Sequence, residues 1–337
     1  MKISSQSFNL LIIIVIIFSN SSFGKEFNKL FEITTPVDEV SNIDNAINKS
    51  FNDLILRLTG TNNSKIIKSI APSLKAKKDF LISYESINID EVPYLVSRFN
   101  KDSLIQKLDN LNISVIGYDR PIVLLLIRVE DGYKDPYILN TSSNSDFDKE
   151  IKNLLKNTSN QRGIFFELPV FDLEDMAELS NITIFDSEEA IILPNYQYDF
   201  LIKFDISQTI INKWTLTGDI QSKEPNSLAA TLQSFNKTLS YLSNDFLSSF
   251  KIPDQESSVK VVVQNINSYE DLSKLQDVLN RFLSIKKMSI KSYIDNSITY
   301  TFDIKGSLES FRKEINSNSL LQLIDIDENV TFISLSN

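Results

Sequence analysis

The most regular apolar pattern in the chain lies between Arg120 and Asp131. Every second residue from Val123 to Val129 is apolar, and the residues between them are also apolar until Arg128. A β-strand that is buried on both faces and emerges at one end has this pattern. The run is also far shorter than the ~20 residues that a membrane-spanning helix needs. We therefore predict a core strand in the middle of the chain.

The region from residue 31 to 117 alternates between strand-like and helix-like patterns. Apolar residues recur at helical spacing from Ile43 to Leu58, which predicts an amphipathic helix that ends at Gly60. The other predicted elements are strands at 31–37, 80–87, 93–99 and 113–116 and helices at 65–70 and 101–111. The resulting order, β-α-(α)-β-β-α-β, is close to a split βαβ, ferredoxin-like unit.

Residues 258–335 have nearly the same order of patterns. The predicted elements are strands at 259–263, 288–294 and 298–304, helices at 269–282 and 307–315, and a last strand at either 321–324 or 330–333. This order predicts a second ferredoxin-like module.

The stretch between these two modules follows the core strand with further α/β patterns. We predict helices at 147–156 and 173–179, a strand at 163–171, a hairpin of 198–207 with 212–221, and a helix at 227–250. The long apolar stripe of the last helix favours packing on the sheet, and a surface shared with a partner is the alternative. Residues 251–258 read as a linker.

The first 24 residues have the pattern of a secretory signal peptide. Lys2 supplies a positive charge, an apolar segment runs from Leu10 to Phe18, and Ser22 and Gly24 are small residues at positions −3 and −1 of a cleavage site. We therefore expect cleavage after Gly24 and export to the periplasm. An uncleaved anchor is the alternative, although the apolar segment is short for a membrane span. No Cys follows the segment, which excludes a lipid anchor of the bacterial lipoprotein type.

The chain of 337 residues contains no Cys and no His. Catalysis by Ser-His-Asp or Cys-His groups is therefore excluded, as are zinc, copper and haem sites built on His or Cys. With 34 basic and 44 acidic residues, the formal net charge is −10, which argues against broad binding to nucleic acid or anionic lipid. No glycine-rich phosphate loop occurs, and we expect no cofactor.

Five carboxylates follow two predicted strands of the middle region. Glu130 and Asp131 end the core strand, and Asp172, Glu174 and Asp175 follow the next strand in the stretch LPVFDLED. If these strands are parallel neighbours, the carboxylates meet at the sheet edge where open α/β sheets bind ligands. Such a cluster would hold Ca²⁺ or Mg²⁺, or would act as an acid/base pair of the glycosidase kind. In the simpler interpretation, Asp172 and Asp175 form a helix capping box and Asp131 belongs to a turn.

Arg128 is a further candidate because it stands among apolar residues at the end of the core strand. It would either form a salt bridge with Glu130 or bind an anionic ligand.

Three stretches together resemble a known family. They are LILRLTG at 54–60, RPIVLL through VED at 120–131, and LP through DLED at 168–175. In this order and spacing, over about residues 30–250, the chain resembles the uncharacterised proteobacterial envelope family catalogued as domain of unknown function 2066. It departs from that pattern at Leu126, where a Trp is expected. The resemblance implies a bacterial source and export, and it implies no activity.

The order of elements in the middle region also resembles that of the N-terminal domain of the envelope protein TolB, which is an analogy of fold alone. We predict an α+β protein with a signal peptide (1–24), an N-terminal ferredoxin-like module (25–118), a TolB-N-like α/β middle domain (119–252) and a ferredoxin-like C-terminal module (258–337). The leading hypothesis is a non-enzymatic periplasmic interaction or assembly factor of the cell envelope. It would act through a protein partner, with no nucleic-acid partner and no membrane span in the mature chain.

Two other functions remain open. One is a periplasmic ligand- or divalent-cation-binding protein that uses Arg128 and the five carboxylates. The other, less favoured, is a carboxylate-based hydrolase, which needs two acids ~5–10 Å apart in a cleft.

Overall fold

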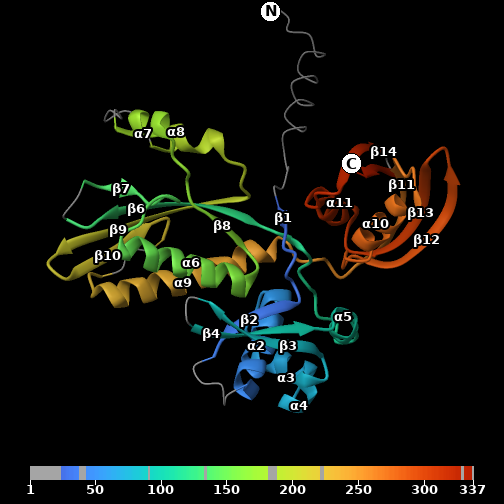
Figure 1. The fold of residues 1–337 in the computed structure, drawn as a ribbon, viewed down its shortest axis with the longest axis horizontal. Helices are drawn as coiled ribbons and strands as arrows, with labels where there is room; N and C mark the ends of the chain where they lie inside the picture. The colour runs from blue at the N-terminus through green and yellow to red at the C-terminus, as the bar shows by residue number, and fades with distance from the viewer. Residues whose placement is uncertain are drawn as a thin grey trace, which may run out of the picture.

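A computed structural model of the chain describes residues 24–37, 43–89, 92–132, 135–180, 188–220, 224–327 and 330–335. These residues form a mixed α+β structure with ten α-helices and several β-sheets. The three larger sheets lie apart from one another, each with its own helices (Figure 1). The predicted signal peptide lies outside the described residues, except for Gly24.

The first large sheet contains three antiparallel strands in the order β2-β4-β3. This part of the chain comprises β2 (Glu32–Pro36), α2 (Ile43–Thr59), α3 (Ser64–Ile70), α4 (Leu74–Lys78), β3 (Leu81–Ile89), β4 (Val92–Phe99) and α5 (Lys101–Asn110). The apolar face of α2 packs on the sheet, because Phe51 and Leu54 are buried together with Ile33 of β2 and Phe99 of β4. The predicted amphipathic helix is therefore confirmed, and Gly60 follows it with a positive φ of 74°.

The predicted strand at residues 113–116 is wrong. Ile116 makes an isolated β-bridge with Lys251, and its N–H donates to the Leu58 oxygen across 2.7 Å. The Ile252 N–H donates to the Val115 oxygen across 2.8 Å. The hydrogen bonds of this segment thus go to the end of α2 and to residues 251–252, so it joins parts of the chain instead of extending the sheet.

The second large sheet is built around the predicted core strand. Its part of the chain comprises β6 (Ile122–Glu130), β7 (Tyr137–Ile138), α6 (Asp146–Arg162), β8 (Phe165–Glu167), α7 (Leu173–Ser180), α8 (Glu188–Ile192), the 3-10 helix η2 (Leu193–Asn195), β9 (Phe200–Ile210), β10 (Lys213–Gly218) and α9 (Leu228–Ser248). β8 and β9 run parallel to β6, β7 runs antiparallel to it, and β10 pairs with β9. The strand predicted at 163–171 is shorter than expected, since Pro169 has no N–H with which to continue a ladder.

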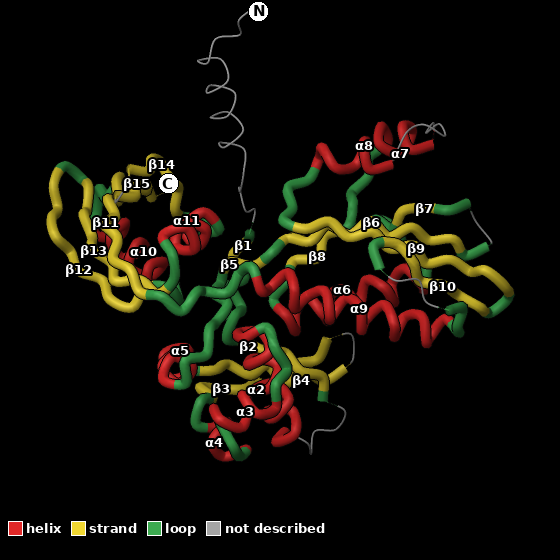
Figure 2. Tube along the Cα trace, turned by 180° about the vertical axis from the view of Figure 1, so that it is seen from behind, coloured by secondary structure: helices red, strands yellow, loops and turns green. Residues whose placement is uncertain are grey.

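Strand β6 is buried on both faces, as its sequence predicts. Leu125 and Ile127 belong to one apolar cluster with Leu155 of α6 and Leu239 of α9. Leu126, on the opposite face, packs in a second cluster that includes Ile192 of α8. Accordingly, α6 and α9 lie side by side under one face of the sheet, and α7 and α8 lie over the other (Figures 1 and 2).

The third large sheet has five strands in the order β12-β13-β11-β15-β14. This part comprises β11 (Glu256–Gln264), α10 (Tyr269–Leu279), β12 (Ile285–Ile294), β13 (Ser297–Lys305), α11 (Leu308–Asn316), β14 (Leu321–Asp327) and β15 (Val330–Leu335). Both alternatives for the last strand therefore exist. β15 lies between β11 and β14 and runs parallel to β11, which adds a fifth strand to the predicted β-α-β-β-α-β order.

A short two-stranded ladder lies where these three parts of the chain meet (Figure 2). It pairs β1 (Lys25–Glu26) with β5 (Asp119–Arg120) in antiparallel register. Among the described residues, no helix has the length and apolar character needed to cross a membrane.

Candidate functional site

The carboxylates after β8 form the capping box that the simpler interpretation predicts. The Asp172 side chain accepts hydrogen bonds from the N–H groups of Glu174 and Asp175, at 2.8 and 2.9 Å. The Asp175 side chain accepts one from the Asp172 N–H at 3.1 Å. These interactions satisfy N–H groups at the start of α7 that have no partner within the helix.

The other predicted site residues lie at the carboxyl end of β6. They are Arg128, Glu130 and Asp131. Arg128 and Glu130 are exposed, and Arg128 stands opposite Asp205 of β9 in the ladder. Asp131 leads into a turn at Gly132, which has a positive φ of 74°. Over the described ranges, no group of three or more acidic side chains is placed to hold a metal ion.

Three buried arginines, Arg57, Arg120 and Arg162, lie where the first and second parts of the chain meet; we call them the arginine hub. Each donates hydrogen bonds to main-chain oxygens of distant segments. Arg57 donates to Lys29, Leu30, Glu32 and Asn160, Arg120 to Arg57, Ile116, Gly117 and Arg162, and Arg162 to Gly60. A planar guanidinium with five N–H donors suits such bridging. The hub ties the end of α2 to β5 and to the end of α6.

Burial shapes the electrostatics of the hub. It lowers the pKa of Arg57 to about 9 and that of Arg162 to about 10, because the charged form loses hydration. The Arg57 guanidinium also lies over the Phe27 ring, 5.0 Å from its centroid. The three side chains belong to residues that are at most 3% exposed, so a dissolved anion does not reach them and the hub is structural.

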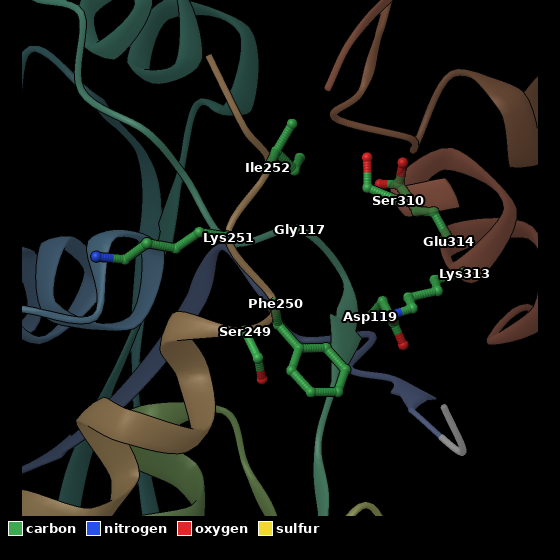
Figure 3. A pocket seen from close by; sticks show the side chains of 9 residues that line it. All are labelled: Gly117, Asp119, Ser249, Phe250, Lys251, Ile252, Ser310, Lys313 and Glu314. Atoms are coloured by element: carbon green, nitrogen blue, oxygen red, sulfur yellow. The ribbon is translucent and has the colours of Figure 1, made fainter. Parts of the chain in front are cut away.

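A cavity of about 40 Å³ lies where all three parts of the chain meet (Figure 3). Asp119 of β5, Phe250 after α9 and Glu314 of α11 line it from different segments. A cavity of this size admits water, whereas pockets for small molecules measure about 300–1,000 Å³.

The two carboxylates at this cavity have different surroundings. Glu314 Oε1 accepts a hydrogen bond from the Leu283 N–H at 3.1 Å, and its other oxygen accepts one from the Ser284 hydroxyl. In contrast, Asp119 Oδ1 is buried and has no hydrogen-bond partner in the part of the chain that the structure describes. Burial, and then the negative charges of Glu314 and Asp199, raise the pKa of Asp119 to about 8.

The third part of the chain is held at this junction by polar contacts. Arg281 Nη2 lies 2.6 Å from Glu26 Oε1, and Asn318 Nδ2 donates to Glu26 Oε2 across 2.7 Å. Lys305 Nζ, almost fully buried, lies 2.6 Å from Asp109 Oδ1 at the end of α5. Residues just after Gly24 therefore contact the part of the chain that is last in sequence.

An open strand edge is the second candidate site. Within the described residues, β3 has a single neighbouring strand, β4, and its seven central residues are all exposed. Ile82 and Tyr84 expose 65% and 49% of their surface, which is high for large apolar side chains in a strand. Glu85, the one charged residue of β3, forms an ion pair of 2.6 Å with Arg98 of β4.

The edge strand β12 of the third sheet differs from β3 in its charges. It also exposes apolar residues, among them Ile290 at 56% and Tyr293 at 57%. However, it carries Lys286, Lys287 and Lys291, and its ladder with β13 is interrupted by two register shifts. Lysines and bulges are the features that protect edge strands from pairing with other chains. The β3–β4 ladder has one register shift, between Leu81 and Ser83, and β3 contains no lysine.

No pattern in the sequence predicts Asp119, Glu314, the arginine hub or the β3 edge as sites. Arg57 is the one member of the hub with a local indication of burial, because it stands among the apolar residues of α2. In comparisons with known proteins, the chain matches no protein-family model, no curated protein and no solved structure.

Proposed function

We propose that this protein is an exported, non-enzymatic interaction or assembly factor of the bacterial cell envelope. It binds an extended segment of a protein partner along the open edge of β3. The observation that carries the proposal is the exposure of seven consecutive residues of β3, which include Ile82 and Tyr84 and no lysine. An edge strand that lacks protective lysines is a ready template for an added strand.

The binding mode follows from the geometry of the strand. Unpaired N–H and C=O groups of β3 supply main-chain hydrogen bonds, which are largely independent of the partner's sequence. Selectivity comes from side chains that alternate between the two faces. Tyr84 and Ser86 lie on one face, opposite Ser97 and Leu95 of β4, and Glu85 lies on the other. The preferred partner segment is therefore extended and has apolar residues at alternate positions.

Several features support export and an envelope role. The predicted signal peptide, with cleavage after Gly24, supports a periplasmic mature chain. The resemblance to the envelope family with domain of unknown function 2066 agrees with this location. The order of elements favours a TolB-N-like middle domain between ferredoxin-like modules at 25–118 and 258–337. Among the described residues, the sheet of the first module has three strands, since 113–116 is not a strand, and the last module has β15 as an added strand.

The cation-binding alternative remains a prediction from the sequence. The contacts of Asp172 and Asp175 are those of a helix cap. The hydrolase alternative likewise has no observation that favours it.

Chemical cross-linking of the tagged full-length protein in its native host, followed by mass spectrometry, tests the proposal. The wild type is compared with Tyr84→Lys, which places a lysine on the β3 edge, and with Ile290→Lys, a matched change on β12. We expect one envelope protein to be captured by the wild type and by Ile290→Lys, and to be lost with Tyr84→Lys. Equal capture by all three proteins would refute docking at β3.

A further inference from the structure

Asp119 is a buried carboxylate whose surroundings do not compensate its charge. Its Oδ1 has no hydrogen-bond partner within the described residues. The charged groups that act on it are Arg120 on its own strand, Glu314 and Lys313 of α11, and Asp199 before β9. The guanidinium N–H groups of Arg120 donate hydrogen bonds to main-chain oxygens. A buried carboxylate oxygen without a hydrogen-bond partner is costly, so a cation that reaches Oδ1 would stabilise the fold.

Gly24 lies directly against this oxygen. A Cβ atom placed on Gly24 would be 2.1 Å from Asp119 Oδ1. Because a carbon–carbon bond is about 1.5 Å, the α-carbon of Gly24 itself lies within about 3.6 Å of Oδ1. The main-chain nitrogen of Lys25 is two bonds further along, and therefore within about 6 Å of the same oxygen.

The residues after Gly24 are held firmly at this place. Lys25 and Glu26 pair with Arg120 and Asp119 in the β1–β5 ladder, and the Phe27 N–H donates to the Tyr118 oxygen across 2.8 Å. The side-chain ammonium of Lys25 is engaged over the Phe165 ring, 5.2 Å from its centroid. The nearby group that would gain a positive charge on processing is thus the main-chain nitrogen of Lys25.

We propose that Asp119 is the binding site for the α-ammonium group that cleavage after Gly24 creates at Lys25. The inference rests on the proposed export and cleavage. A signal-peptidase-class endopeptidase adds water across the Gly24–Lys25 bond. Gly24 leaves as the carboxylate of the released leader, and the Lys25 nitrogen becomes an amine that takes up a proton at neutral pH. Departure of Gly24 frees the space beside Oδ1, so that an N–H donor of the ammonium can bind this oxygen.

This contact distinguishes the processed chain from its precursor. In the precursor the Lys25 nitrogen is an uncharged amide, and Asp119 Oδ1 has no hydrogen-bond partner within the described residues. In the mature chain the ion pair forms beside Glu26, whose carboxylate binds Arg281 and Asn318. Cleavage therefore stabilises the junction of the three parts of the chain after export.

A cycle of four proteins tests the proposal. One chain begins at Lys25 with a free amine, the other begins at Ser22 and retains Gly24, and each is made with Asp119 and with Asp119→Asn. We expect the Lys25 chain to have a Tm on the order of 2–4 °C higher than the extended chain at neutral pH, and this difference to vanish with Asp119→Asn. Asp303→Asn, an exposed change of equal charge, should leave the difference intact. Equal Tm values, or a difference that persists in Asp119→Asn, would overturn the proposal.

Titration of the Lys25 amine by pH-dependent chemical labelling gives a second readout that does not depend on the variants. We expect labelling at least tenfold slower near pH 8 than in a free peptide, whose α-amine has a pKa of about 7.7–8.0. Labelling at the peptide rate would contradict the ion pair. The N-terminus of the protein recovered from cells is a separate measurement: a first residue other than Lys25 would refute the cleavage site, whereas the Tm cycle addresses the contact itself.

Discussion

Arg120 donates a hydrogen bond from its guanidinium to the main-chain oxygen of Arg57 across 2.9 Å. Both side chains are buried, and each reaches oxygens of segments that are far apart in the sequence. A main-chain oxygen cannot move without moving its segment, so these bonds fix the end of α2 relative to β5. The first and second parts of the chain are thus joined by hydrogen bonds from arginine side chains to main-chain oxygens.

Replacing Arg120 with Lys should weaken this junction strongly. Arg120 donates to four main-chain oxygens, whereas one ammonium cannot reach all of them. Each buried oxygen left without a donor costs about 1–3 kcal/mol. We expect Arg120→Lys to lower the free energy of unfolding by about 3 kcal/mol, measured by urea denaturation.

Arg98→Lys is the control for this change, because Arg98 is exposed and pairs with Glu32 and Glu85 at the surface. We expect its urea midpoint to match that of the wild type. Equal midpoints for Arg120→Lys and Arg98→Lys would show that the hub does not stabilise the fold.

The burial of Asp119 predicts how the free energy of unfolding depends on pH in a chain that retains Gly24. Its pKa is raised from 3.8 to about 8, first by burial and then by Glu314 and Asp199. The folded state therefore keeps a proton that the unfolded state releases, and stability is greatest below the unfolded pKa and falls as the pH rises toward 8. Urea midpoints at about pH 5 and about pH 8 should differ less in Asp119→Asn than in the wild type. The buried Glu314 acts in the same direction, so the comparison between variants is the test.

If the urea midpoint depends on pH equally in the wild type and in Asp119→Asn, Asp119 does not hold this proton.

The capping box predicts a local effect of Asp172. Asp172→Ala removes the acceptor for the Glu174 and Asp175 N–H groups, which should cost about 1 kcal/mol of local stability. Hydrogen exchange should accelerate at the start of α7 and stay unchanged in β6. Ca²⁺ should leave the Tm unchanged in both proteins. A Tm that rises with Ca²⁺ in the wild type and not in Asp172→Ala would favour the cation-binding alternative instead.

The sequence predicts individual elements well where a single apolar period decides them. β6 and α2 lie where Val123–Val129 and Ile43–Leu58 predict them, since their burial follows from their own side chains. The strand at 113–116 fails because the Ile116 N–H donates to the Leu58 oxygen and the Val115 oxygen accepts from the Ile252 N–H, so tertiary contacts decide its conformation.

The contacts at the junction of the three parts cannot be predicted from the sequence for a related reason. Arg57, Arg120 and Arg162 come from three separate elements, and their shared partners are main-chain oxygens, which leave no pattern in the sequence. The cap formed by Asp172 and Asp175 was predictable because both partners lie within one turn.

Docking at β3 predicts that charge on this edge affects binding and leaves stability intact. Ile82 exposes 65% of its surface, so Ile82→Lys should change the free energy of unfolding by no more than about 0.5 kcal/mol. Partner capture should nevertheless fall, because a lysine on an edge strand opposes the addition of another strand. Loss of capture accompanied by unfolding would not support a role of the edge.

A photo-reactive residue placed at position 82 and activated in living cells tests docking at β3 most directly. The same residue at position 290, on the exposed face of β12, is the matched control. We expect one dominant cross-linked envelope protein from position 82 and none from position 290, with the cross-link mapping to an extended segment of the partner. The same products from both positions, or none from position 82, would contradict it.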